Sequence, residues 1–230
     1  MKQFIQGRSF WVTFFVIVMS AWYEAESQRV VSLTPSVTEL IVDMGCSDVL
    51  VGRTSYCPNV NAVVVGDILS VNMEKVVSLK PDIVICVGFV EASTIEKMQK
   101  MGINVKSYKT PRSFDEMCRQ TIEIGSLIGV ADKAESIVKE ERRRVEELKK
   151  KVVKTQKRVL FQIGTRPMFS VVDNTYTQGF IDDLGLINVS HTTMPSREYV
   201  VSQNPDYVIL TTMGGLYKEE SKVWQKLIKA

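Results

Sequence analysis

The side chains best suited to hold a ligand lie just beyond the ends of predicted strands. Tyr56 and Phe89 offer flat apolar faces, and Arg166 offers a charged donor for a carboxylate or phosphate. In open α/β sheets, ligands bind beyond the carboxyl ends of the strands. These ends fall at residues 34–36, 55–57, 87–89, 164–167 and 191–196. The sequence therefore predicts a binding cleft built from these loops.

Patterns that would indicate catalysis or a clustered metal site are absent from the sequence. It contains no G-x-S-x-G, G-x-G-x-x-G, P-loop or H-E-x-x-H pattern. His191 is the only histidine; it could be a single axial ligand to iron or cobalt, but a polar loop residue is the simpler interpretation. The cysteines form no C-x-x-C pair and are Cys46, Cys57, Cys86 and Cys118. Cys46 and Cys57 could form a disulfide, which the sequence leaves open.

Strands and helices alternate along the chain from residue 29 onward. Short β-branched runs predict strands at 29–34, 49–51, 63–65, 82–87, 103–108, 158–163, 168–172, 187–189 and 206–211. Capping residues, glycine and proline bound predicted helices at 37–44, 73–79, 92–100, 113–128, 132–154, 175–184, 197–203 and 221–229. This alternation predicts an α/β fold with mainly parallel sheets and helices on both faces.

The predicted helix 132–154 differs from the others because most of its surface is charged. Asp132 can cap its start, acids precede lysines along it, and its length would be roughly 33 Å. The segment MEKVVSLKPDIVIC before this helix is matched by REYVVSQNPDYVIL after it. The repetition favours two Rossmann-like lobes, 28–130 and 156–230, bridged by one long helix at 131–155, over a single domain with a solvated surface helix.

Residues 1–27 differ in composition from the rest of the chain. Lys2 and Arg8 precede the apolar run FWVTFFVIVMSA, and small residues follow it at Ala25 and Ser27. This order predicts a secretory signal peptide, with an uncleaved membrane anchor as the alternative. No cysteine directly follows the run, so we expect a periplasmic protein without a lipoprotein anchor. The net charge of +3 does not indicate a nucleic-acid partner, and we expect a monomer.

Several segments in a fixed order resemble one family of transport proteins. The family is the substrate-binding proteins of ABC importers for vitamin B12, haem and ferric siderophores. The similar segments are RVVSLTPSVTEL, VLVGRTSYCPNV, NMEKVVSLKPDIVI, the long charged helix, KRVLFQIG and SREYVVSQNPDYVIL. The resemblance runs from about residue 29 to the end and is strongest to the vitamin B12-binding branch. It implies two lobes that hold a metal chelate between them and deliver it to an ABC transporter permease, with no intrinsic cofactor.

The resemblance also implies roles for individual residues. It places the two glutamates that dock on permease arginines at Glu74 in NMEKVV and Glu198 in SREYVV. For the ligand, it implies contacts from Pro35, Ser36 and Tyr56. The repeat gives a physical reason for the glutamates, because equivalent helices of equivalent lobes would present two carboxylates on one surface.

The ligand pocket departs from the family pattern. Two tryptophans that line the vitamin B12 pocket fall at about Val87 and Thr192, and Phe89 could replace the first. Gly164 and Arg166, from the loop after a strand of the second half, are further candidate ligand contacts. The chelate is therefore left open between a corrinoid, haem and a ferric siderophore.

The chain also stops several tens of residues before family members usually end, so we expect an incomplete second lobe. Two competing hypotheses remain. One is a metal-dependent enzyme of related two-lobed architecture, which needs His or Cys ligands in the cleft, where Cys86 alone of the cysteines lies near a strand end. The other is a sensor that kept the fold and lost transport.

Overall fold

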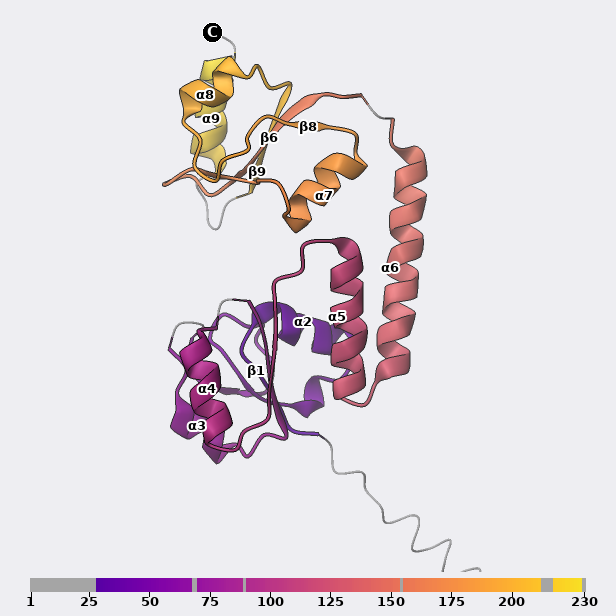
Figure 1. Cartoon of the computed structure of the whole chain (residues 1–230), viewed down its shortest axis with the longest axis vertical. Helices are drawn as coiled ribbons and strands as arrows, with labels where there is room; N and C mark the ends of the chain where they lie inside the picture. Colours follow the sequence, from indigo (N-terminus) through magenta and orange to yellow (C-terminus); the bar gives the residue numbers. More distant parts are fainter. Residues whose placement is uncertain (1–27, 68–69, 89, 154, 212–216, 229–230) are drawn as a thin grey trace, which may run out of the picture.

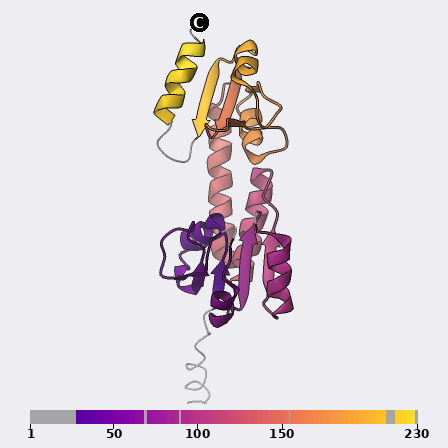
Figure 2. The ribbon, with the colours of Figure 1, turned by 90° about the vertical axis from the view of Figure 1, so that its left-hand side faces the viewer.

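The structure is a computed structural model that describes residues 28–67, 70–88, 90–153, 155–211 and 217–228. Two α/β lobes follow each other along the chain and are joined by helix α6 (Ala131–Lys151) (Figure 1). Figure 2 shows the molecule from the side, with α6 running behind both lobes. The predicted fold class is confirmed. The predicted signal peptide lies outside the described residues, and none of the described helices is long and apolar enough to cross a membrane.

The first lobe is built on a five-stranded, fully parallel sheet. Its strand order is β3-β2-β1-β4-β5, which is a doubly wound arrangement with its switch point between β1 and β4. The strands are β1 (Val30–Ser32), β2 (Leu50–Arg53), β3 (Val63–Val64), β4 (Ile83–Val87) and β5 (Val105–Tyr108). The helices are α2 (Pro35–Asp43), α3 (Met73–Ser78), α4 (Ala92–Lys100) and α5 (Phe114–Leu127), with a 3₁₀ turn at Ser47–Val49.

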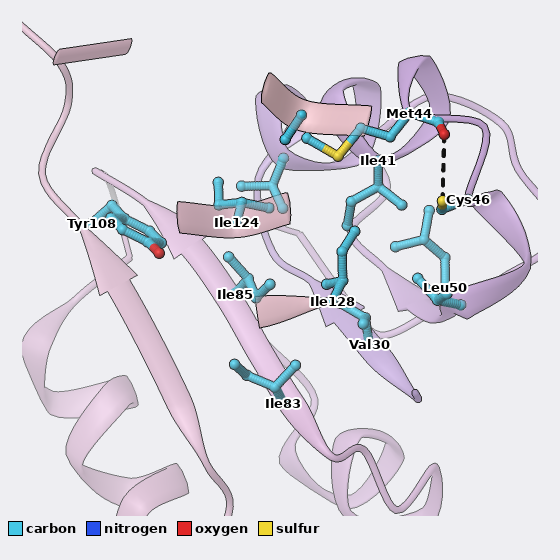
Figure 3. Close-up of a cluster of buried hydrophobic side chains, with 13 residues drawn as sticks. Val30, Ile41, Met44, Cys46, Leu50, Ile83, Ile85, Tyr108, Ile124 and Ile128 are labelled. Carbon is cyan, nitrogen blue, oxygen red and sulfur yellow. Dashed lines mark hydrogen bonds between the residues drawn. The ribbon is translucent and has the colours of Figure 1, made fainter. Parts of the chain in front are cut away.

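Two apolar cores fill the first lobe, one on each face of its sheet. On one face, α2, α5 and the start of α6 pack on β1 and β4 through a cluster that includes Val30, Ile41, Ile85 and Ile124 (Figure 3). On the other face, α3 and α4 pack against the alternate residues of the same strands. Successive residues of a strand point to opposite faces, so the β-branched runs supply both cores.

The four cysteines are buried free thiols, so the disulfide between Cys46 and Cys57 is not formed. The Cys46 Sγ instead donates a weak hydrogen bond to the Met44 carbonyl at 3.4 Å (Figure 3). Both residues belong to the core under α2. This thiol therefore behaves as a small apolar core side chain.

The second lobe is built around one strand, β6 (Arg158–Ile163). Strand β9 (Tyr207–Thr211) pairs with it in parallel along one edge. The other edge is shared by β8 (Ile187–Asn188), which is parallel, and β7 (Phe169–Ser170), which is antiparallel. Helix α7 packs on one face and α8 and α9 on the other. Their bounds are Tyr176–Asp183, Arg197–Ser202 and Tyr217–Ile228.

The sequence repeat corresponds to one structural unit in each lobe. Arg29 precedes β1; its backbone N–H donates to Asp82 Oδ2 at 2.6 Å, and its guanidinium donates to the Leu79 carbonyl at 2.8 Å. Arg158 repeats the pattern at the start of β6. Its backbone N–H donates to Asp206 Oδ2 at 2.7 Å, and its guanidinium donates at 2.7 Å to the carbonyl of Gln203, the C-cap residue of α8. In each lobe this Arg–Asp anchor attaches the end of the short helix to the start of the first strand.

Helix α6 is packed into the first lobe and lightly attached to the second. Ala134 and Val138 are buried, and a Cβ at Gly125 of α5 would lie 2.3 Å from the Ala134 Cβ. The absent side chain at Gly125 therefore permits the close crossing of α5 and α6. Near its other end, Lys149 forms an ion pair with Asp183 of α7 at 3.2 Å.

The start of α6 differs from the sequence-based prediction. The helix begins at Ala131 with Val130 at the cap position and no side-chain cap, so Asp132 is not the cap. Its carboxylate lies in the first turn, where it still interacts favourably with the helix dipole. The helix ends at Lys151, earlier than the predicted end at Lys154, because Val152 is extended and Val153 is not helical.

Two boundaries in the second lobe also differ. The predicted strand at 168–172 is reduced to the two residues of β7, because only Gln162 and Ile163 of β6 pair with it. Helix α9 begins at Tyr217, earlier than the predicted start at Ser221. Its early start is favourable because acidic side chains then occupy the first turn.

Candidate functional site

A cavity of about 660 Å³ lies between the two lobes. This volume is in the range of small-molecule sites. Helices α2 and α5 of the first lobe form its base, α6 forms one side, and α7 of the second lobe faces them (Figure 1). The lining is mainly apolar and includes Thr34, Val87, Phe114, Cys118, Ile137 and Tyr176.

Hydrogen bonds fix the ends of the strands that reach the cavity. Thr34 Oγ1 accepts a hydrogen bond from the Val87 N–H at 2.8 Å, which links the ends of β1 and β4. Thr38 Oγ1 donates to Ser32 Oγ at 2.8 Å, which ties α2 to β1. Thr34, Thr38 and Ser32 are buried. The hydroxyl residues around the β1–α2 turn therefore hold the cavity base in place.

Two aromatic rings of α7 bring the second lobe to the cavity. Thr175 caps this helix by accepting from the Gln178 N–H at 3.2 Å. Tyr176 and Phe180, one turn apart, have ring centroids 4.8 Å apart and meet edge to face at 83°. Burial raises the pKa of the Tyr176 hydroxyl, and the Cys118 thiol adds to the shift. Tyr176 is thus a neutral hydroxyl beside a large apolar face.

Cys118 lies in the part of the wall formed by α5 and is almost fully buried. Burial raises the pKa of its thiol, an effect that the Arg142 charge partly opposes. A neutral thiol is a poor nucleophile. Within the residues that the structure describes, no three His, Cys, Asp or Glu side chains are grouped so that they could hold a metal ion.

The charged side chains of the cavity wall are all acidic. Glu39 and Asp43 lie on α2, whose last turn carries no basic residue. Glu141 of α6 is paired with Arg144 at 2.8 Å. The carboxyl end of a helix adds partial negative charge. Because the described lining contains no Lys, Arg or His, the formal charge of the lining residues is negative.

The predicted ligand contacts of the first lobe are dispersed. Ser36 lines the cavity. Pro35 precedes it at the first position of α2, where proline suits the helix start. Tyr56 is 69% exposed in the loop after β2 and does not line the cavity. Phe89 lies outside the described residues.

The predicted contacts of the second lobe lie outside this cavity. Gly164 follows β6 with a φ of 78°, in the left-handed region that favours glycine. Arg166 and Thr192 are exposed on loops of the same lobe. His191 Nδ1 lies 3.1 Å from Asp173 Oδ2 on the surface. Contacts from these residues to a ligand stay predictions.

A buried arginine that the sequence analysis missed shapes the Tyr56 loop. Arg53, at the end of β2, is 8% exposed. Its guanidinium donates to the carbonyls of Thr54 at 3.3 Å and Cys57 at 3.4 Å, and to Asn59 Oδ1 at 2.8 Å. An arginine that ends a strand directly before a loop without acidic residues is the sequence signal that points to such a role.

The two predicted docking glutamates lie on equivalent helices. Glu74 and Glu198 are in the first turns of α3 and α8, and both are exposed. Asn72 and Ser196 cap these helices by accepting from backbone N–H groups at 3.0 and 3.1 Å. Hydrogen bonds from its backbone N–H and from the Ser196 hydroxyl lower the pKa of Glu198. Helices α3 and α8 both lie on the side of the molecule away from α6 (Figure 1).

The chain is similar in sequence to the proteins of one known family. A family model described as periplasmic binding protein matches residues 30–230. The cobalamin-binding protein of Halobacterium salinarum is 30% identical over 202 residues, which cover 81% of this chain and 54% of that protein. The chain thus spans about half the length of this curated relative.

Two solved structures from Vibrio cholerae share the fold. The periplasmic heme-binding protein HutB aligns with a TM-score of 0.75 at 20% identity, over 89% of this chain and 84% of that one. The periplasmic vitamin B12-binding protein BtuF aligns with a TM-score of 0.73 at 20% identity, over 88% and 84%. Since the family model covers the chain from β1 to its last residue, the chain belongs to the periplasmic binding protein family.

Proposed function

We propose that the protein is an extracytoplasmic solute-binding protein that holds a metal chelate between its lobes and delivers it to an ABC transporter permease. The observation that carries the proposal is the cavity between the lobes, walled by α2, α5, α6 and α7. Apolar surface with a few hydroxyl and amide groups suits reversible capture of a large ring system. Membership of the periplasmic binding protein family supports the same function.

Among the candidate chelates, the charge of the cavity wall favours a corrinoid. Haem carries two propionates and many ferric siderophores are anionic, so both are best held by cationic donors. The carboxylates of Glu39 and Asp43 would instead repel them. The neutral amide side chains of a corrinoid can hydrogen-bond to groups such as Gln120 and Thr110 of the lining. The name of the Halobacterium salinarum relative agrees with this choice.

The permease is the proposed partner of Glu74 and Glu198. Both carboxylates are exposed in the first turn of a short helix, and each helix is attached to its lobe by an Arg–Asp anchor. Two fixed negative charges on one side of the molecule suit a partner with two cationic sites. Reversing both, in Glu74→Lys/Glu198→Lys, should abolish permease binding and leave chelate affinity unchanged.

The deciding experiment is a titration of the purified chain with cyanocobalamin and with two anionic chelates, hemin and a ferric tris-catecholate siderophore, followed by calorimetry and tryptophan fluorescence. We expect cyanocobalamin to bind saturably and hemin to bind at least about tenfold more weakly, a difference of about 1.4 kcal/mol. Tyr176→Ala should weaken cyanocobalamin binding by roughly tenfold, since it removes an aromatic face from the cavity wall.

Tyr217→Ala is the matched control, because Tyr217 is a 52% exposed tyrosine outside the cavity lining. It should leave the affinity unchanged. If no chelate binds to the folded chain, the proposed function is wrong. Tighter binding of hemin than of cyanocobalamin would overturn the corrinoid assignment while leaving the solute-binding role intact.

A further inference from the structure

One carboxylate of the second lobe is buried although chelate capture does not require it. Glu220, in the first turn of α9, is 6% exposed. A buried carboxylate is costly unless it is paired and hydrogen-bonded. Its Oε1 accepts from Gln162 Nε2 at 2.9 Å and from Arg197 Nη2 at 2.6 Å. Glu220 thus has a cationic partner from α8.

Gln162 fixes the orientation of this buried group. It is fully buried on β6, and its Nε2 also donates to the Gly164 carbonyl at 2.8 Å. Its Oε1 accepts from Trp224 Nε1 of α9 at 2.7 Å. With both ends of the amide engaged, the nitrogen end must face Glu220. The network therefore holds α9 against β6 and keeps the Glu220 carboxylate directed at α8.

The cation that Glu220 holds is the sequence neighbour of a proposed docking residue. Arg197 and Glu198 are consecutive residues in the first turn of α8. The Arg197 side chain is two-thirds buried and paired with Glu220. Glu198 is exposed and forms no ion pair with another described residue. Of the causes that lower the pKa of Glu198, the Arg197 charge is the smallest.

In the first lobe, the cation next to the docking glutamate is held away from it by a different contact. Lys75 follows Glu74 in α3, and its Nζ donates to the Val64 carbonyl at 3.1 Å. Lys75 forms no ion pair with Glu74 in the described part of the chain. Both exposed glutamates therefore keep their charge beside a cation that is engaged elsewhere.

We propose that Glu220 is a positioning residue for this surface: it holds Arg197 toward the interior of the lobe, so that the charge of Glu198 stays available to a cationic partner. The identity of that partner rests on the proposed function, whereas the effect on Glu198 is a property of this chain alone. Besides Glu220, the Trp224 ring contacts the Arg197 guanidinium, with 6.0 Å between Cζ and the ring centroid. Without a charged partner at position 220 this weaker contact alone would hold the guanidinium inward, and Arg197 would turn outward to neutralise Glu198 for part of the time.

The primary test is an NMR titration of the Glu198 carboxyl group in the wild-type chain and in Glu220→Gln. The substitution keeps the shape and a hydrogen-bond acceptor but removes the charge. We expect the pKa of Glu198 to fall by roughly a further 0.2–0.7 unit, the size of an exposed ion pair. A role of Glu220 in packing alone would not move this titration, and the direct electrostatic effect of removing its charge is separated from the turning of Arg197 by the control and the double variant that follow.

Glu219→Gln is the matched control, because Glu219 is an exposed acid on the same turn of α9. It should leave the Glu198 titration unchanged. The double variant Arg197→Gln/Glu220→Gln should return the pKa of Glu198 to the wild-type value or above it. The double variant also covers the case in which Glu220→Gln fails to fold, since losing both partners of a buried pair is better tolerated than losing one.

Binding to the permease supplies a second readout. Glu220→Gln should weaken binding roughly threefold to fivefold, as expected for partial neutralisation of one interface charge. It should have no further effect in a Glu198→Gln background, because it acts through Glu198.

An unchanged Glu198 pKa in folded Glu220→Gln would overturn the proposal, and so would equal weakening of permease binding with and without Glu198. If Glu198→Gln alone leaves permease binding unchanged, the docking role in the proposed function is wrong. The titration then still decides whether Glu220 holds Arg197.

Discussion

The two lobes carry the same short helix followed by the same kind of strand, yet they bury that strand differently. Strand β4 lies between β1 and β5, and all but the last of its residues are buried. Strand β9 pairs only with β6 among the described strands; its ends are exposed and its middle is half-buried. The local details nonetheless match, down to a residue with positive φ before each Pro-Asp, Lys80 at 44° and Asn204 at 48°. Local chemistry therefore sets the shape of the unit, and its neighbours in space set its burial.

This difference suggests that the lobes differ in stability, and the largest test is the removal of Trp224. Trp224 is 2% exposed in the core under α8 and α9 and donates to Gln162. Trp224→Ala should lower the free energy of unfolding of the second lobe by about 3–5 kcal/mol. Hydrogen exchange resolved by lobe, combined with urea denaturation, measures the effect.

The matched change in the first lobe is Ile124→Ala, which removes a side chain of the core in Figure 3 that is also 2% exposed. It should cost about 2–5 kcal/mol and lower amide protection in the first lobe. Equal loss of protection in both lobes from either variant would mean that the lobes unfold as one unit, and the comparison would fail.

Two helix-interior glycines sharpen the comparison at smaller magnitude. Gly125→Ala in α5 places a methyl group against Ala134 and should destabilise the chain by about 1–3 kcal/mol. The Cβ added by Gly179→Ala in α7 meets no atom of the described residues within 4 Å, so this change should stabilise the chain by about 0.5–1 kcal/mol. Thermal denaturation of both variants measures the two effects. A stabilising Gly125→Ala would show that α5 and α6 can separate without cost.

The smallest effect concerns the two Arg–Asp anchors at low pH. Lys157 donates to Asp206 at 2.7 Å and, with the Arg158 N–H, lowers the pKa of Asp206. Because the folded-state pKa is depressed, this stabilisation is present above the ordinary aspartate pKa of about 3.9 and is lost as the pH falls below it. The midpoint of urea denaturation should therefore decrease as the pH is lowered from about 4 to about 2.

The Asp206→Asn variant should remove part of that pH dependence. Asp82→Asn changes the anchor of the first lobe, whose carboxylate forms no ion pair with a described residue. It should alter the acid dependence less than Asp206→Asn does. The reverse order would contradict the assignment of the low-pH loss to the anchor of the second lobe.

Much of the fold could be predicted because it depends on local signals. Asn72 and Ser113 cap their helices as expected, accepting from the Lys75 and Glu116 N–H groups, and α4 has the predicted bounds. The repeated helix–Pro-Asp–strand segments can be recognised directly in the sequence. These features need only neighbouring residues to form.

The candidate site was predicted less well because its walls come from distant parts of the chain. Tyr176 reads in the sequence as an ordinary helix residue, and it reaches the cavity only because α7 faces α5 across the gap between the lobes. Conversely, Tyr56 follows a strand as a ligand contact should, but Arg53 holds its loop in a form that leaves the ring exposed. The buried pair of Arg197 and Glu220 was not visible in the sequence either, since it joins two helices by tertiary contact.

The light attachment of α6 to the second lobe has a mechanical consequence. Its 21 residues give a rod about 31 Å long, seated at the Gly125–Ala134 crossing and paired with α7 near its far end. A rotation of about 5° at the seat moves the far end, about 25 Å away, by about 2 Å. Because Glu74 and Glu198 each belong to one lobe, such a rotation changes the spacing between the two carboxylates. A change in the angle of α6 thus becomes a change in the distance between two docking carboxylates, and the fit to a partner with two fixed cationic sites depends on that distance.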